Sequence, residues 1–198
     1  MNRRSALGLL LAALAAAGCD GFLPGAKTPF HGVDITGSDL GPDFRLRDHN
    51  GQERSLADFR GKVVAMFFGY THCPDVCPTT LSDMAAALKA LGPDGSRVQV
   101  LFVTVDPKRD TPELLRNYVP AFHPTFLGLY GDAAATDKVK KDFKIYAAEQ
   151  PGRTPETYSV DHAAMTLVFD ARGKLRLMLP YGTPGDKIAS DLRILLNS

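Results

Sequence analysis

A strand pattern, a turn and a helix pattern follow one another in KVVAMFFGYTHCPDVCPTTLSDMAAALKAL, residues 62–91. The run 63–68 is apolar without a break, as in a strand that is buried on both faces of a sheet. From 78 to 91 the apolar residues recur at helical spacing, and Gly92 and Pro93 end that pattern. A buried strand that leads through a turn into a helix indicates an α/β fold, which places its sites at such turns.

The segments on either side also alternate between strand and helix patterns. Upstream, 44–48 and 53–56 flank the turn signal Asn50-Gly51 and predict a β-hairpin. Asp110 is expected to cap a helix that continues to Phe122. The other predicted elements are strands at 98–105 and 126–130, a helix at 132–143, a hairpin of 166–169 with 174–179, and a helix at 183–196. This order predicts an α/β sandwich, with a mixed central sheet flanked by helices and an N-terminal β-hairpin.

The composition of the 198-residue chain excludes several classes of protein. Its residues are 44% hydrophobic and 23% charged, which suffices for one domain with a sizeable core and argues against a disordered chain. The formal net charge is +1 at pH 7, so no overall field favours nucleic acid. We therefore expect no nucleic-acid partner.

The amino terminus is typical of a bacterial export signal. Arg3 and Arg4 precede an apolar run at 6–17, which is shorter than the roughly 18 residues of a membrane span. The sequence Ala-Ala-Gly-Cys at 16–19 resembles a lipobox, in which the cysteine is lipidated and becomes the first residue after cleavage. The alternative is an ordinary secretory signal with a cysteine near its cleavage site.

Lipidation of Cys19 would divide the chain into three parts. We expect a signal peptide at 1–18, a flexible tether at 19–37 and a folded domain at 38–198. The lipid anchor would hold the domain to the membrane, in the bacterial cell envelope, on the outer (periplasmic) face of the cytoplasmic membrane.

Cys73 and Cys77 are the residues with the clearest chemistry. They lie four residues apart at the turn before the predicted helix, where their thiols can meet. Cys77 falls at the helix start, where we expect the helix dipole to stabilise its thiolate. Two neighbouring thiols can exchange with a disulfide or hold a soft metal ion. A structural disulfide and a structural zinc site are alternatives, although zinc usually takes four protein ligands.

A metal site needs a third ligand, and the chain has five histidines: His31, His49, His72, His123 and His162. His31, in the tether, and His49, in the hairpin turn, are expected to be solvated. His72 could lower the pKa of the neighbouring Cys73 or be a surface residue, and His123 has no evident partner. His162 lies in a loop before the predicted strand 166–169, where a histidine is either structural or a ligand.

Three blocks of sequence resemble those of the Sco/SenC family of copper proteins, which have a thioredoxin fold. The blocks are FGYTHCPDVCP at 68–78, VDPKRDTP at 105–112 and VDH at 160–162. The resemblance implies a thioredoxin-like fold and one copper ion per chain, Cu(I) or Cu(II), bound by Cys73, Cys77 and His162. Two thiolates and an imidazole form a soft ligand set that suits Cu(I), and Cu(II) would accept it with an added oxygen ligand.

Several residues of these blocks have two possible roles. Asp161 could orient the imidazole of His162 or cap a loop. Asp106 and Arg109 could support the site or the docking of a partner, or act as turn and capping residues. Met84 and Met165 carry potential thioether ligands, but both fit the pattern of the core.

The resemblance implies a membrane-tethered copper chaperone that delivers copper to the dinuclear copper site of cytochrome c oxidase. The expected partners are the copper-accepting subunit of that oxidase, a protein that reduces the thiols, and the membrane. The alternative is a thiol–disulfide oxidoreductase in which Cys73 and Cys77 are catalytic and reduce the acceptor's cysteines. A peroxidase is a third possibility, which would require a peroxide-activating environment around one cysteine. His162 distinguishes the first two, because a reductase needs only the cysteine pair.

Overall fold

The computed structural model describes residues 29–41, 43–154 and 157–198. The predicted signal peptide, Cys19 and the first part of the tether lie outside the described residues. Within the described ranges, no helix has the length and apolar character that crossing a membrane requires.

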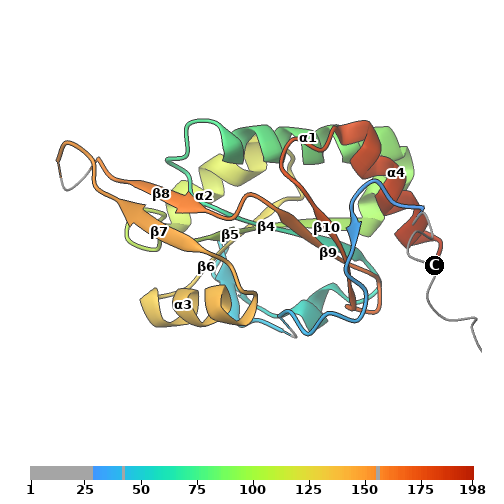
Figure 1. Ribbon diagram of the computed structural model, residues 1–198, viewed down its shortest axis with the longest axis horizontal. Helices are drawn as coiled ribbons and strands as arrows, with labels where there is room; N and C mark the ends of the chain where they lie inside the picture. The colour runs from blue at the N-terminus through green and yellow to red at the C-terminus, as the bar shows by residue number, and fades with distance from the viewer. Residues whose placement is uncertain (1–28, 42, 155–156) are drawn as a thin grey trace, which may run out of the picture.

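An eight-stranded mixed sheet forms the centre of the domain, in the order β1-β10-β9-β4-β5-β6-β2-β3 (Figure 1). The parallel pair β4 (Val63–Gly69) and β5 (Val98–Thr104) lies at its centre, and every residue of both strands is buried. The other strands are β1 (Val33–Asp34), β2 (Leu46–Asp48), β3 (Glu53–Arg54), β6 (Leu127–Tyr130), β9 (Thr166–Phe169) and β10 (Leu175–Leu179). The uninterrupted apolar run 63–68 therefore belongs to a strand buried on both faces, as predicted, and the strand predicted at 98–105 is also completely buried from 98 to 104.

Helices cover both faces of this sheet. Figure 1 shows α1, α2 and α4 above the sheet and α3 below it. The helices are α1 (Val76–Leu91), α2 (Pro112–Tyr118), α3 (Ala133–Asp142) and α4 (Gly185–Leu196), with short 3₁₀ segments η1 (Leu56–Phe59), η2 (Gly92–Arg97) and η3 (Val119–Ala121). The predicted α/β sandwich, with its mixed sheet and N-terminal hairpin β2–β3, is confirmed.

A second, two-stranded sheet stands apart from the large one. It consists of β7 (Ala147–Gln150) and β8 (Ser159–His162), paired antiparallel. In Figure 1 this β7–β8 hairpin extends to the left, beyond the end of β5. His162 was expected in a loop and is instead the last residue of β8. Only one residue of β8 is buried, so the strand has too little apolar alternation to be recognised from sequence.

Two regions that were expected to be solvated belong to the folded structure. Residues 33–34, assigned to the tether, form β1 and pair with β10. Just before them, the backbone N–H groups of His31 and Gly32 donate to the buried Asp191 carboxylate on α4, at 2.8 and 2.7 Å. His49 is only 4% exposed, and its Nδ1 accepts a hydrogen bond from the Gly128 N–H. The prediction of a solvated His49 is wrong because the hairpin turn packs against β6.

Candidate metal centre

Cys73, Cys77 and His162 lie together beyond the end of β4. One ligand atom from each, the two Sγ atoms and a ring nitrogen, lies within 4.8 Å of the others, and Cys77 Sγ is 3.4 Å from His162 Nε2. With metal–donor bonds of about 2.0–2.3 Å, donors around one ion lie roughly 3.5–4.0 Å apart. The three donors therefore fit a single ion after small adjustments. No other such group of three ligating residues occurs in the part of the chain that the structure describes.

The end of β4 and the start of α1 position the two cysteines. The turn between them is closed by a hydrogen bond from the Cys73 N–H to the Tyr70 carbonyl, at 3.3 Å. Cys77 lies in the first turn of α1 and is completely buried, whereas Cys73 is half-buried. A Cβ added to Gly69 would lie 2.7 Å from Cys77 Sγ, so the lack of a side chain at the end of β4 makes room for this sulfur.

Asp110 ties the cysteine-bearing turn to the neighbouring strand. Its buried carboxylate accepts hydrogen bonds from the Thr71 N–H, from Thr71 Oγ1 at 2.6 Å and from Thr104 Oγ1 at 2.6 Å. Burial raises the pKa of this carboxyl, although the threonine hydrogen bonds oppose the shift. The prediction that Asp110 caps α2 is wrong, because Thr111 Oγ1 accepts the Leu114 N–H instead.

His162 reaches the cysteines from the β7–β8 hairpin. Its Nε2 faces Cys77, and its Nδ1 lies 3.1 Å from the Ala163 carbonyl. This carbonyl can accept a hydrogen bond from Nδ1–H in the tautomer that leaves the Nε2 lone pair free for a metal. The rings of Phe67 and Tyr70 contact the imidazole edge-on, with centroid distances of 6.0 and 5.8 Å. Asp161 is exposed, because successive residues of β8 face opposite sides. The orienting role considered for Asp161 is thus taken by the Ala163 carbonyl.

The pKa values of the two thiols are shifted in opposite directions. The hydrogen bond with Cys77 is the main cause that lowers the pKa of Cys73, and His162 and the backbone N–H groups of Asp75 and Cys77 add to the effect. The same hydrogen bond, together with burial, raises the pKa of Cys77. These directions make Cys73 the more acidic of the two thiols, whereas the helix dipole was expected to favour a thiolate at Cys77. The Cys73 sulfur accepts hydrogen bonds from backbone N–H groups at the start of α1, whereas Cys77 is buried inside the first turn of that helix.

The remaining candidate ligands lie elsewhere. His72 is half-exposed, and its Nδ1 lies 3.1 Å from Thr71 Oγ1 and 3.9 Å from Asp110 Oδ1. His123 Nδ1 lies 2.9 Å from Thr125 Oγ1. Met84 is buried and Met165 partly buried in the hydrophobic core, as their spacing predicts.

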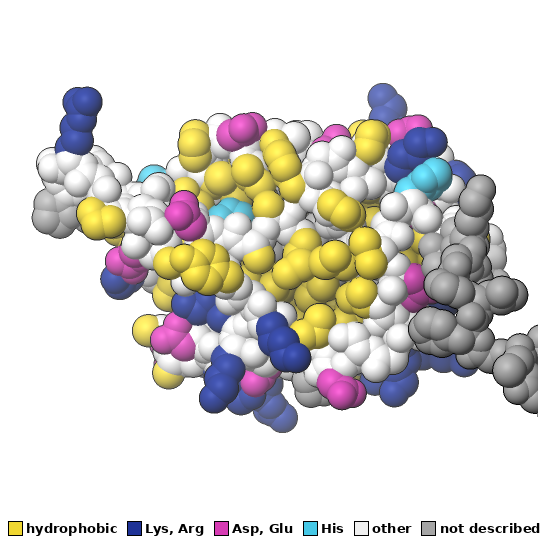
Figure 2. Space-filling view, in the orientation of Figure 1, with side chains coloured by type: hydrophobic (Ala, Val, Ile, Leu, Met, Phe, Trp, Pro, Cys, Tyr) yellow, Lys and Arg dark blue, Asp and Glu magenta, His cyan; other side chains and the backbone are white. Residues whose placement is uncertain are grey.

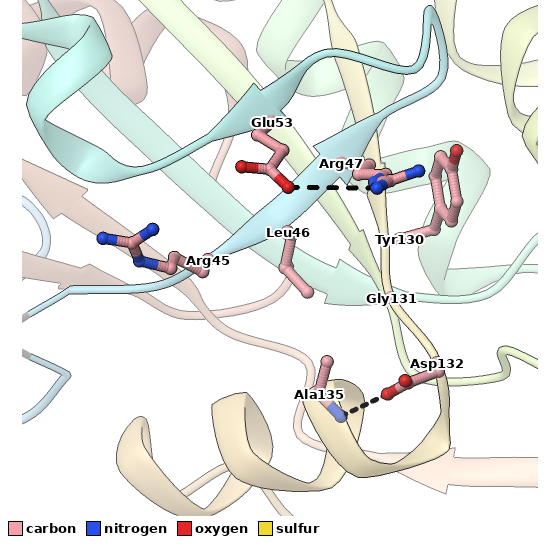
Figure 3. A pocket seen from close by; sticks show the side chains of 8 residues that line it. All are labelled: Arg45, Leu46, Arg47, Glu53, Tyr130, Gly131, Asp132 and Ala135. Carbon is pink, nitrogen blue, oxygen red and sulfur yellow. Dashed lines mark hydrogen bonds and ion pairs between the residues drawn. The ribbon is translucent and has the colours of Figure 1, made fainter.

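A groove of about 550 Å³ lies apart from the three donors, between the β2–β3 hairpin and α3 (Figure 3). Figure 3 shows Leu46 directed toward Ala135, and Glu53 facing Arg47 at 3.9 Å above them. The lining residues are Arg45, Leu46, Arg47, Glu53, Tyr130, Gly131, Asp132 and Ala135. Because this lining contains neither cysteine nor histidine, the groove offers no soft metal ligand.

Known proteins are similar to this chain in sequence and in fold. The SCO1/SenC family model matches residues 33–197. The mitochondrial SCO2 homolog of Danio rerio is 41% identical over 133 residues, which cover 66% of this chain and 48% of that protein. The chain thus spans about half the length of the vertebrate relatives that it matches.

Solved structures of similar proteins share the fold of this chain. ScoI of Bradyrhizobium japonicum, solved with copper bound, is 38% identical, with 79% of this chain and 99% of that chain covered and a TM-score of 0.74. BsSco, described as a member of the Sco family of cytochrome c oxidase assembly proteins with a disulfide switch, shares the fold at 21% identity. That comparison covers 84% of this chain and 97% of BsSco, with a TM-score of 0.63. The predicted thioredoxin-like fold is confirmed.

Proposed function

Because this chain belongs to the SCO1/SenC family, we propose that it is a copper chaperone that binds one copper ion through Cys73, Cys77 and His162. The observation that carries the proposal is the convergence of two sulfurs and an imidazole nitrogen within 4.8 Å. The copper-bound relative from Bradyrhizobium japonicum supports copper as the ion. Thiolate and imidazole donors in a low-coordinate set favour Cu(I) over the harder divalent ions.

Delivery to the dinuclear copper site of cytochrome c oxidase is the second part of the proposal. The description of BsSco's family as oxidase assembly proteins supports an oxidase as the recipient. Transfer would proceed by ligand exchange, in which thiolates of the copper-accepting subunit replace Cys73 and Cys77 one at a time. No free copper ion is then released.

The cellular setting follows from the amino-terminal sequence. A signal peptide at 1–18 and a lipid on Cys19 would hold the domain at the periplasmic face of the cytoplasmic membrane. In this oxidising compartment the cysteine pair would need a reductant protein to restore its thiols before each loading.

Thiol–disulfide reduction is a second candidate function, favoured by the unequal acidities of the two cysteines. The half-buried Cys73 thiolate would attack one sulfur of an acceptor disulfide and release the other as a thiolate. Cys77, after giving its proton to the acceptor thiolate released in the first step, would then attack the Cys73 sulfur of the mixed disulfide and release the acceptor's second sulfur as a thiolate. The acceptor gains two electrons, and this chain is left with a Cys73–Cys77 disulfide.

Titration of the reduced full chain with Cu(I), against a competing chelator, tests whether the three proposed ligands bind copper. We expect about one ion per chain in the parent and none at the same chelator concentration in Cys73→Ser, Cys77→Ser and His162→Ala. His123→Ala removes a histidine far from the donors and is the matched control. Full binding by His162→Ala would contradict the proposed site. If that variant loses copper but still reduces an acceptor disulfide, the two functions are separable.

A further inference from the structure

The position of His162 depends on contacts outside the main sheet. The β7–β8 hairpin is not hydrogen-bonded to any strand of the eight-stranded sheet. Two consecutive residues of the loop after β5 contact the hairpin instead. Lys108 Nζ donates to Glu149 Oε1 on β7 at 2.6 Å, and Arg109 Nη1 donates to the carbonyl of Tyr158, just before β8, at 2.8 Å.

Arg109 is the more deeply engaged of the two. Its side chain is 16% exposed, and its Nε donates to Asp106 Oδ2 at 2.6 Å. The Tyr158 hydroxyl donates to the other oxygen of Asp106 at 2.7 Å, and the guanidinium carbon lies 3.6 Å from the centroid of the Tyr158 ring. We call Asp106, Arg109 and Tyr158 the arginine clamp. Each member contacts both others, so the clamp fixes the start of β8 in position and orientation.

The clamp also reaches the aromatic wall of the metal site. The Arg109 guanidinium lies 5.7 Å from the centroid of the Tyr70 ring, and this ring contacts His162 edge-on. Arg109 therefore contacts both Tyr158, the residue just before the strand that bears His162, and the Tyr70 ring that the imidazole contacts. By contrast, the Lys108–Glu149 ion pair is exposed, with side-chain exposures of 66% and 49%, and contributes little to such positioning.

We propose that Arg109 is a positioning residue for the metal site: through the arginine clamp it holds β8 so that His162 stays within reach of Cys77. The inference rests on the proposed role of His162 as a ligand. A guanidinium suits this task because it is planar, stacks on an aromatic ring and presents several donors in a fixed geometry, which an ammonium group does not. Without the clamp, the hairpin would spend more time with His162 withdrawn, and copper affinity would fall with the populated fraction of the competent arrangement.

Copper competition on the full chain tests this inference with a matched pair of variants. Arg109→Met keeps the aliphatic stem and removes the guanidinium, and we expect it to weaken Cu(I) binding about 10–100-fold, as substitutions of residues that support metal ligands do. Lys108→Met makes the same change one residue earlier, and we expect less than about a threefold effect because its ion pair is exposed. Equal losses in the two variants would overturn the proposal in favour of a general charge effect.

A double-mutant cycle and hydrogen exchange separate positioning from a loss of stability. In a His162→Ala background, titrated against a weaker chelator that leaves the residual Cu(I) binding measurable, Arg109→Met should weaken that binding no further, because the ligand that it positions is gone. In the metal-free chain it should speed amide exchange in β7 and β8 but not in β4. If Arg109→Met does not fold, Tyr158→Leu removes the stacked ring and hydroxyl with the same expected results. Independent, additive losses, or unchanged exchange in the hairpin, would refute the clamp; unaltered binding by His162→Ala alone would instead refute the proposed ligand set.

Discussion

The sulfur half and the imidazole half of the proposed metal site are held by different kinds of structure. Cys77 is completely buried at the start of α1, directly after a strand whose every residue is buried, and Asp110 anchors the turn in between. His162 is partly exposed at the end of a two-stranded hairpin, outside the main sheet. The hydrophobic core therefore fixes the sulfurs, whereas a few polar and aromatic contacts fix the imidazole.

This difference predicts two kinds of response to substitution. A change near the sulfurs should lower the free energy of unfolding of the whole domain. A change in the hairpin should lower the free energy of its local opening while the rest of the domain stays folded, because segments with few buried contacts open independently.

Gly69→Ala tests the sulfur half and should have the largest effect on stability. The new Cβ would lie 2.7 Å from Cys77 Sγ and 2.9 Å from a ring carbon of Phe102. Overpacking of this kind costs about 1–3 kcal/mol, and relief of the clash would displace Cys77. Denaturant unfolding and Cu(I) competition should both show losses. Parent-like stability together with parent-like copper affinity would mean that the core does not fix this sulfur.

Val160→Ala tests the imidazole half. Val160 is the buried residue of β8, and its truncation should lower the free energy of hairpin opening by about 1–2 kcal/mol. Native-state hydrogen exchange should show this loss in β7 and β8. Val100→Ala, a matched change in β5, should instead lower the global free energy of unfolding. If Val160→Ala lowers the global value as much as Val100→Ala does, the hairpin is not an independent unit.

Asp110→Asn tests the sulfur half through the pH dependence of the free energy of unfolding, and it should have the smallest effect of the three substitutions. The pKa of Asp110 is raised by burial, so the folded state binds this proton more tightly than the unfolded chain does. The parent should therefore lose stability as the pH rises from below 3.8 through the raised pKa, and the asparagine variant should lack that loss. We expect the free energies of unfolding of the parent and of Asp110→Asn to differ by about 1 kcal/mol, because the substitution removes one acceptor of the threonine hydrogen bonds.

Unfolding free energies of both proteins between pH 3 and 7 check this prediction. The parent-minus-variant difference should fall as the pH rises. A difference that grows with pH would mean that the hydrogen bonds from Thr71 and Thr104 outweigh burial and lower the pKa of the carboxyl.

The central elements could be predicted from the sequence because their signals are local. The apolar runs of β4 and β5 and the helical spacing in α1 depend on neighbouring residues, and the structure confirms them. Cys73 and Cys77 could be recognised as a pair because only four positions separate them.

The imidazole half could not be derived in this way. His162 lies 85 residues from Cys77, and β8 has a single buried residue, so only the family resemblance pointed to His162 as a candidate ligand. The clamp joins Asp106 and Arg109 to Tyr158 across 52 and 49 residues, a contact that no local pattern reveals. The directions of the two cysteine pKa shifts could likewise not be predicted, because the sequence does not show which sulfur is buried in the core.

The hydrogen bonds from residues 31–32 to Asp191 would limit how far the domain could move from a lipid anchor at Cys19. If lipid is attached at Cys19, only the residues from 19 to 30 separate the bilayer from the folded body. Even a fully extended chain of that length spans about 40 Å, at roughly 3.3–3.6 Å per residue. Such a linker would be comparable in length to the diameter of a small domain, and it would restrict the domain's search for an acceptor to a thin layer along the membrane surface.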